Sequence, residues 1–159
     1  MRSFLMGLCL TLAIATPTAA QDLVERKGWE VANTSAGYEE LVDHLVAAVK
    51  SERMIVVTQA SASAGAKGRG LTIPGNRVIG VYRNDYAVRM LEASVAAGIE
   101  APIRFYVTEN ADGTATLSWK KPSFVFEPYM NEGGEELADL AAELDDVFQT
   151  IAEKAVASK

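Results

Sequence analysis

Cysteine is almost missing from this sequence: the only one, Cys9, lies in an apolar stretch at the N-terminus. If that stretch is removed as a signal peptide, the mature chain has no thiol. Disulfide bonds, thiolate catalysis and metal binding by cysteine are then excluded together. Histidine is nearly as scarce, because His44 is the only one and no second histidine exists to complete a zinc site.

Long apolar runs are also scarce, and the one that is present runs from Phe4 to Ala15, which is too short to span a bilayer comfortably. Arg2 precedes this run and the small residues Thr18-Ala19-Ala20 follow it, which is the layout of a secretory signal peptide. We expect residues 1–20 to be a signal peptide cleaved near Ala20. The mature protein is then periplasmic or secreted, and residues 21–159 suffice for a single domain without a membrane span.

Basic residues are the minority, with 15 Lys and Arg against 21 Asp and Glu. The formal charge is −6, and it becomes −7 once Arg2 is removed with the signal peptide. Such a balance argues against nucleic-acid binding. The bases nevertheless concentrate between residues 67 and 91, where five of them face a single acid and the local charge is +4. This asymmetry favours an anionic ligand or an acidic partner, although dispersed surface charges would give the same pattern.

No catalytic motif accompanies this basic stretch. The sequence has no Gly-x-Ser-x-Gly, and the segment from Gly65 to Gly70 lacks the spacing of a phosphate-binding P-loop. That segment is either an exposed loop or an anion cradle. His44 is expected at the flank of a helix and not as a general base. We identify no catalytic residue, metal ligand or cofactor, but carboxylates distant in sequence could still converge into an active site.

Local patterns predict eight elements of secondary structure. Strands are expected at about 29–34, 54–60, 77–83, 103–108 and 114–119, and helices at about 36–53, 85–97 and 135–157. Ser35 is expected to cap the first helix, residues 54–60 to form a largely buried strand, and residues 61–70 to form a loop. The order β-α-β-β-α-β-β-α predicts an α+β fold, with a mixed sheet covered by helices in two layers.

Short segments spread from Tyr38 to Ile151 support a family resemblance. They are Leu71-Thr72-Ile73-Pro74, Val78-Ile79-Gly80-Val81-Tyr82 leading to Asn84, Glu100-Ala101-Pro102-Ile103-Arg104, Thr108-Glu109, Asp112-Gly113 and Pro122. In this order they resemble the bacterial family named domain of unknown function 302. The resemblance implies a small α+β fold and a homodimer, and it implies no reaction.

The candidate ligand-binding residues combine the basic stretch with aromatic residues on the predicted strands. The aromatic side chains would either fill the core or wall an apolar pocket. We predict that Lys67, Arg69 and Arg83 face an anion, and that Asn84 and Arg104 lie at the rim of an adjacent pocket.

The sequence thus favours an exported, non-catalytic binding or accessory domain for a small anionic or partly apolar molecule. The alternatives are a carboxylate-dependent enzyme and a purely structural dimerisation module.

Replacing Leu8–Ile14 with charged residues should block export, because a signal peptide needs an apolar centre. The uncleaved precursor should then be found in the cytoplasmic fraction by immunoblotting. N-terminal sequencing of the exported wild-type protein should begin near Gln21, and an exported protein that retained Met1 would contradict the assignment.

Overall fold

The computed structural model describes residues 23–158. The predicted signal peptide at 1–20, with Cys9 and the cleavage position near Ala20, lies outside the described residues. Within residues 23–158, every helix is too short or too polar to cross a membrane.

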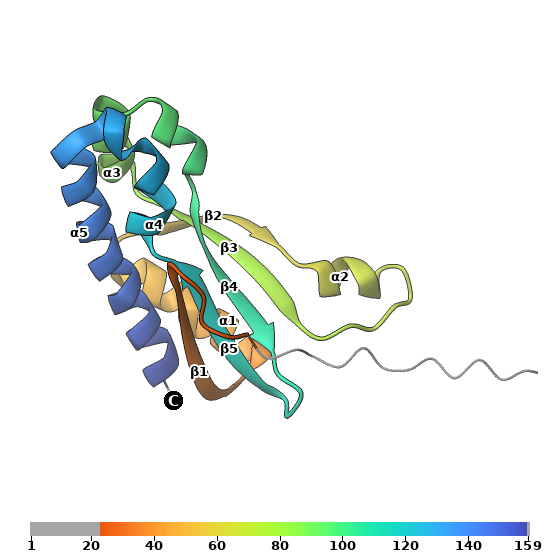
Figure 1. The fold of residues 1–159 in the computed structure, drawn as a ribbon. Helices are drawn as coiled ribbons and strands as arrows, with labels where there is room; N and C mark the ends of the chain where they lie inside the picture. The colour runs from red at the N-terminus through yellow and green to blue at the C-terminus, as the bar shows by residue number, and fades with distance from the viewer. Residues whose placement is uncertain (1–22, 159) are drawn as a thin grey trace, which may run out of the picture.

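The centre of the fold is an antiparallel sheet of five strands in the order β1-β5-β4-β3-β2 (Figure 1). The strands are β1 (Trp29–Gly37), β2 (Ile55–Ala60), β3 (Asn76–Tyr82), β4 (Ile103–Glu109) and β5 (Thr114–Lys120). Strands β2 to β5 follow one another as neighbours, whereas β1 pairs with β5 at the far edge. The α+β class and the helix-covered sheet are therefore confirmed, but the sheet is antiparallel throughout and not mixed as predicted.

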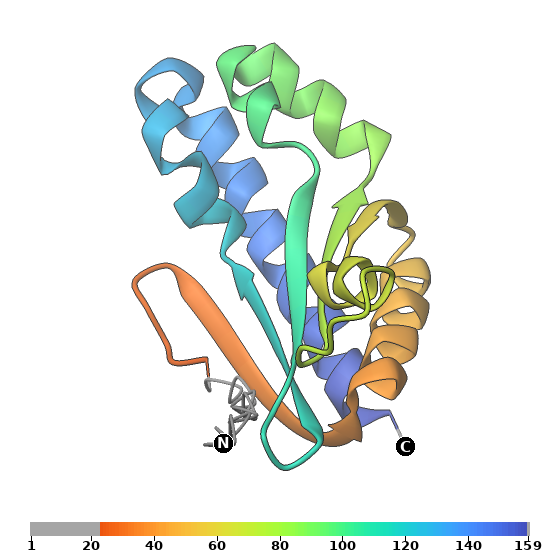
Figure 2. The same ribbon diagram turned by 90° about the vertical axis from the view of Figure 1, so that its right-hand side faces the viewer.

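Helices cover one face of this sheet and leave the other face open (Figure 2). The helical segments are α1 (Tyr38–Ser51), α2 (Ala62–Lys67), α3 (Asn84–Ala93), η1 (Ala96–Glu100), α4 (Pro122–Phe126), η2 (Glu127–Tyr129) and α5 (Met130–Ala157). Helix α1 links the two edge strands and contacts all five strands, while α5 packs against α1, α3 and α4. Helix α2 lies on the opposite side and projects away from α5 (Figure 1).

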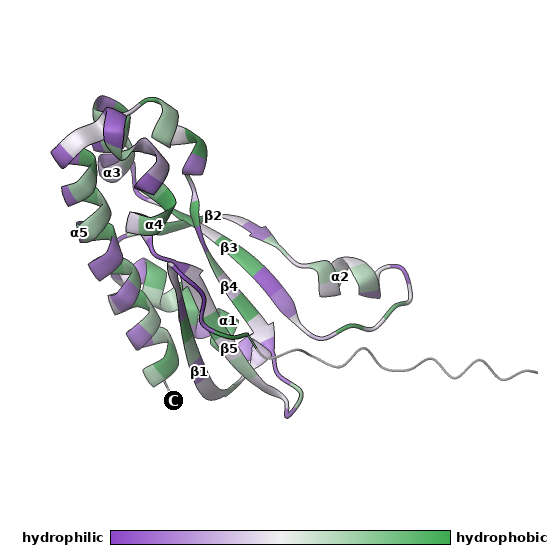
Figure 3. Cartoon of the chain, viewed as in Figure 1, coloured by the Kyte–Doolittle hydropathy of each residue, from purple (hydrophilic) through white to green (hydrophobic). Residues whose placement is uncertain are grey.

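The core lies between the sheet and helices α1 and α5. Phe105 of β4 is fully buried, and its ring stacks on that of Phe148 of α5 with a centroid distance of 4.6 Å. Hydrophobic and hydrophilic residues alternate along α5, as a helix with one buried face requires (Figure 3). The predicted alternation along β4 is confirmed, because Ile103, Phe105 and Val107 are buried while the residues between them are not.

The first helix starts later than expected. Strand β1 continues through Ser35 to Gly37, and α1 begins at Tyr38. The predicted cap at Ser35 is wrong: the helix is preceded by Gly37, whose backbone N–H donates to Glu40 Oε2 at 3.3 Å. A serine before an apolar stripe favours a helix start, but Ser35 lies in an irregularity of β1 between Thr34 and Gly37, which both pair with β5.

Strand β2 is an edge strand and not the largely buried strand that its composition suggested. Its only partner is β3, and Ile55 and Val57 are 56% and 44% exposed. A run of β-branched residues favours a strand, but it does not determine whether that strand lies at the centre or at the edge of a sheet.

The predicted loop at 61–70 contains the short helix α2. Ser61 precedes this helix, and its hydroxyl accepts a hydrogen bond from the backbone N–H of Ala64 at 3.0 Å. None of its residues is buried, so no apolar periodicity marked it. The segment between the predicted strand at 114–119 and the predicted helix at 135–157 forms α4 and η2, and α5 begins at Met130, with Gly134 at a non-helical φ of 58°.

Gly80 in the middle of β3 should tolerate no side chain. A Cβ there would overlap Thr58 Oγ1 and would lie 2.9 Å from Pro102 Cγ. We expect Gly80→Ala to lower the free energy of unfolding by about 1–3 kcal/mol, the usual cost of overpacking. Urea denaturation measures this change.

Gly65→Ala is the matched control, because Gly65 lies in exposed α2 and nothing lies within 4 Å of its added Cβ. Alanine there should be neutral or should stabilise the protein by up to about 1 kcal/mol, since it favours a helix over glycine. Equal effects of the two substitutions would contradict the packing described around Gly80.

Candidate functional site

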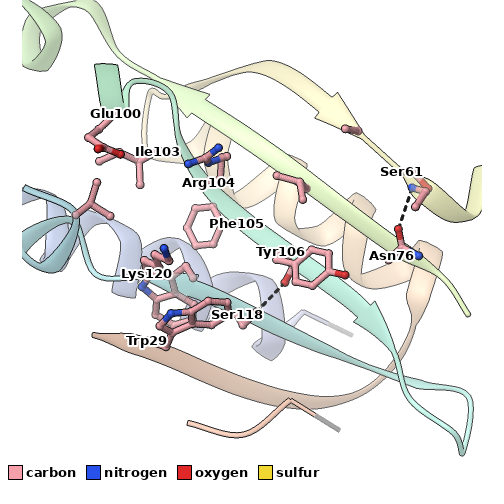
Figure 4. Close-up of a pocket in the computed structure, with 15 residues that line it drawn as sticks. Trp29, Ser61, Asn76, Glu100, Ile103, Arg104, Phe105, Tyr106, Ser118 and Lys120 are labelled. Atoms are coloured by element: carbon pink, nitrogen blue, oxygen red, sulfur yellow. Dashed lines mark hydrogen bonds between the residues drawn. The ribbon is translucent and has the colours of Figure 1, made fainter. Parts of the chain in front are cut away.

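A cleft of about 650 Å³ lies on the open face of the sheet (Figure 4). Tyr106 of β4 lies at its centre, because the register places this residue between Val78 of β3 and Ser118 of β5. Trp29 of β1 bounds the cleft on one side, and Ser61 at the start of α2 bounds it on the other. The volume is within the range typical of small-molecule sites.

Alternation along the strands explains which side chains reach this cleft. Successive side chains of a strand point to opposite faces, so burial of Phe105 toward the helices turns Arg104 and Tyr106 to the open face. The same rule applies to β5, where Trp119 packs against Phe105 and Lys120 points to the other side. Arg104 and Lys120 therefore reach the same cleft from adjacent strands.

Both of these cations are exposed and neither forms an ion pair within residues 23–158. Lys120 Nζ lies 5.9 Å from the centroid of the Trp29 ring, close enough for a cation–π interaction. The cleft thus places two positive charges beside an aromatic surface, and both charges are available to an anion.

One carboxylate, that of Glu100, is found in the part of the cleft lining that the structure describes. The phenol of Tyr129 donates a hydrogen bond to Glu100 Oε1 at 2.8 Å. This hydrogen bond raises the pKa of Tyr129 above its ordinary value, because it stabilises the protonated phenol. The negative charge of Glu100 acts in the same direction, since it disfavours a phenolate beside it.

Asn76 fixes the position of α2 relative to β3. Its Oδ1 accepts from the backbone N–H of Ala62 at 2.9 Å, and its Nδ2 donates to the carbonyl oxygen of Pro74 at 3.0 Å. The backbone N–H of Asn76 in turn donates to Ser63 Oγ at 3.2 Å. These bonds hold the side of the cleft formed by α2, even though that helix buries no apolar side chain.

The five residues predicted to bind a ligand do not form one surface. Arg104 lines the cleft, whereas Lys67 lines a separate pocket beside α2 and Arg69 follows that helix. Arg83 and Asn84 follow the other end of β3. Because a strand of seven residues is about 20 Å long, they lie far from the α2 end.

Arg83 is engaged by its neighbours. Its guanidinium forms two hydrogen bonds to the carboxylate of Asp85, at 2.7 and 3.0 Å, and lies 4.0 Å from the centroid of the Tyr86 ring. The hydrogen bond from Arg83 lowers the pKa of Asp85 below its ordinary value. Asn84 accepts a hydrogen bond from the hydroxyl of Tyr82 at 3.2 Å.

Acids distant in sequence neutralise two other bases of the stretch from residue 67 to residue 91. Arg77 pairs with Glu39 of α1 at 3.5 Å, and Arg89 forms two hydrogen bonds to Glu143 of α5 at 2.8 Å each. Half of the local charge of +4 is therefore compensated in space by acids from outside the stretch.

The cleft residues that sequence reasoning missed are Trp29, Lys120 and Glu100. Lys120 was identifiable in principle, because it continues the alternation of β5 by one residue. Trp29 was not, because its place depends on the pairing of β1 with β5 across 90 residues of chain. His44 lies on α1 outside the cleft and is partly buried. Within residues 23–158, no three His, Cys, Asp or Glu residues come together as a metal site.

Comparison with known proteins adds a family and a fold. The family model described as "Domain of unknown function DUF302" matches residues 29–154. No curated protein matches the chain. The crystal structure of an uncharacterized conserved protein DUF302 from Bacillus stearothermophilus superimposes with a TM-score of 0.72 and 21% sequence identity. The match covers 82% of this chain and 99% of that one, and at this identity it supports the fold alone.

Proposed function

Since this chain belongs to the family described as domain of unknown function DUF302, which brings a fold and no reaction, we propose a function from the cleft itself: the protein is an exported, non-catalytic domain that binds a small, partly apolar anion on the open face of its sheet.

One observation carries this proposal: Arg104 and Lys120 face an aromatic-walled cleft without an ion-pair partner in residues 23–158. By contrast, Arg77, Arg83 and Arg89, which lie outside the cleft, each have an acidic partner. A carboxylate, sulfonate or phosphate in the cleft would form charge-assisted hydrogen bonds with the two free cations. An apolar part of the same ligand would lie against Trp29 and Tyr106.

Export and the lack of catalysis rest on the sequence and on the composition of the cleft. The layout of residues 1–20 supports export, and the mature chain would have no thiol. A carboxylate-dependent enzyme usually pairs two carboxylates or a carboxylate with a histidine, and the described lining of the cleft supplies neither partner for Glu100. Binding without chemistry is therefore the better-supported function.

Arg104→Ala should weaken an anionic apolar probe. We expect 8-anilinonaphthalene-1-sulfonate to bind the folded wild-type protein, and the substitution to weaken binding by about tenfold, because it removes a charge-assisted hydrogen bond of about 1.5 kcal/mol. Lys120→Ala should act in the same direction. Added salt should weaken the binding as well, since both cations are solvent-exposed. Fluorescence titration measures each affinity.

Arg69→Ala is the matched control, because Arg69 is exposed but lies outside the cleft. It should leave the affinity unchanged, and so should Arg83→Ala. The proposal is wrong if the folded Arg104→Ala protein binds the probe as tightly as the wild type. It is equally wrong if Arg69→Ala or Arg83→Ala weakens binding as much as Arg104→Ala.

A second candidate function, a structural dimerisation module, is favoured by strand β2. This edge strand, Ile-Val-Val-Thr-Gln-Ala, carries no charge, and Ile55 and Val57 are largely exposed. Edge strands of stable monomers are usually protected by charged residues, proline or bulges; β2 has no charge and no proline, and its one irregularity lies between Val56 and Thr58. A second copy could pair antiparallel with β2 without bringing like charges together. We therefore propose a homodimer in which the two copies meet at this edge.

Val57→Lys should convert the dimer to a monomer, because a lysine on the edge strand would be desolvated by pairing and would face its counterpart near the twofold axis. Light scattering after size exclusion measures the mass at high micromolar concentration. Val88→Lys is the control, since Val88 on α3 is 46% exposed, close to the 44% of Val57. A monomeric wild-type protein would contradict the proposal, and so would dissociation caused by Val88→Lys alone.

A further inference from the structure

The cleft carries charges of both signs at one end. Glu100 is the last residue of η1, and Arg104 follows four residues later, near the start of β4. Both residues line the cleft, and together with Lys120 they also line an adjoining pocket of about 460 Å³ that extends to Phe124. Figure 4 shows the carboxylate of Glu100 and the guanidinium of Arg104 at the same end of the site.

These opposite charges do not neutralise each other. Glu100 forms no ion pair with Arg104, with Lys120 or with any other base in residues 23–158. Tyr129 occupies only one of its carboxylate oxygens, Oε1, and no described residue donates to Oε2. A carboxylate held in this way keeps one oxygen for a donor that the protein itself does not supply.

A purely anionic ligand would leave this arrangement unused. An anion bound to Arg104 would experience repulsion from Glu100, whereas a molecule that also carries an ammonium group would satisfy both. The ammonium would donate to the free oxygen of Glu100, while the acid group would accept from Arg104 and Lys120. The apolar body of the molecule would then extend along Tyr106 toward Trp29.

We propose that the ligand is a zwitterion, an amino acid or short peptide with an apolar or aromatic side chain, and that Glu100 selects its ammonium group. This inference rests on the proposed anion-binding function, because it assigns a second recognition element to the same cleft. It adds a specificity that the cations alone cannot provide, namely discrimination against simple acids of the same shape.

Three probes of one shape separate the two charges. L-phenylalanine carries both, 3-phenylpropionate lacks the ammonium, and phenethylamine lacks the carboxylate. Calorimetric titration should give an affinity for phenylalanine at least tenfold higher than for either analogue. The dipeptide Phe-Phe, titrated beside them, tests whether the cleft prefers adjacent or separated charges. Binding of phenylalanine above 3-phenylpropionate and phenethylamine supports the proposal.

Glu100→Gln should remove the preference for the zwitterion. We expect this variant to lose about tenfold in affinity for phenylalanine and to bind 3-phenylpropionate as well as the wild type does, or better. Tyr129→Phe is the control for a structural effect, because it removes the hydrogen bond between the two side chains but keeps the carboxylate. The folded Tyr129→Phe protein should retain the preference for phenylalanine.

The outcomes distinguish a failure of the zwitterion inference from a failure of the proposed anion-binding function. If 3-phenylpropionate binds in an Arg104-dependent manner but phenylalanine binds no better, or if Glu100→Gln leaves the affinity for phenylalanine unchanged, the zwitterion inference is overturned and anion binding stands. If neither these acids nor 8-anilinonaphthalene-1-sulfonate binds in an Arg104-dependent manner, the proposed function fails and the zwitterion inference fails with it.

Discussion

The packing of β4 against α5 is the contact on which the rest of the structure depends. The ring of Phe105 stacks on Phe148 and fixes which face of the central strand is apolar. Because the strand alternates, this single choice also fixes Arg104 and Tyr106 on the opposite face. The register then determines which side chains of the neighbouring strands point to each face. The same packing contact therefore determines both the core and the cleft. A slip of one residue in β4 would bury a guanidinium and expose a phenylalanine.

Charge is distributed according to the same division between two faces. Helices α1 and α5 supply Glu39 and Glu143 to arginines that the sequence places in an isolated basic stretch. The bases that stay without partners in residues 23–158 include Arg104 and Lys120 on the open face, which α1 and α5 do not cover. Glu39 and Glu143 cannot reach the cleft, because α1 and α5 lie on the other side of the sheet, and Glu100 is the one carboxylate in its described lining. The exposed ion pairs of Glu39 and Glu143 contribute little to stability, but they determine which cations are left for a ligand.

Local patterns were sufficient for the elements whose signal is contained in a few residues. The alternation of β4, the Asp112-Gly113 turn with Gly113 at a φ of 85°, and the apolar stripe of α5 were all predictable. The exposed edge position of β2 and the place of Trp29 beside Lys120 were not, because both depend on pairings between distant segments. Of the predicted site residues, Arg104 lines the cleft because its strand was read correctly. The other four were grouped with it because they are close in sequence: Lys67, Arg69, Arg83 and Asn84. The seven residues of β3 separate the first two from the last two in space.

The strand order also implies a sequence of events as the chain acquires its structure. Strands β2 to β4 each pair with the next strand along the chain, whereas β1 must wait for β5, which follows it by most of the domain. Loop closure over that distance costs more entropy and proceeds more slowly. If the chain crosses a membrane from its N-terminus, β1 emerges first and finds its partner last. Trp29, and with it one wall of the cleft, would then be put in place at the end of folding, so that an incompletely folded chain has no finished site to fill.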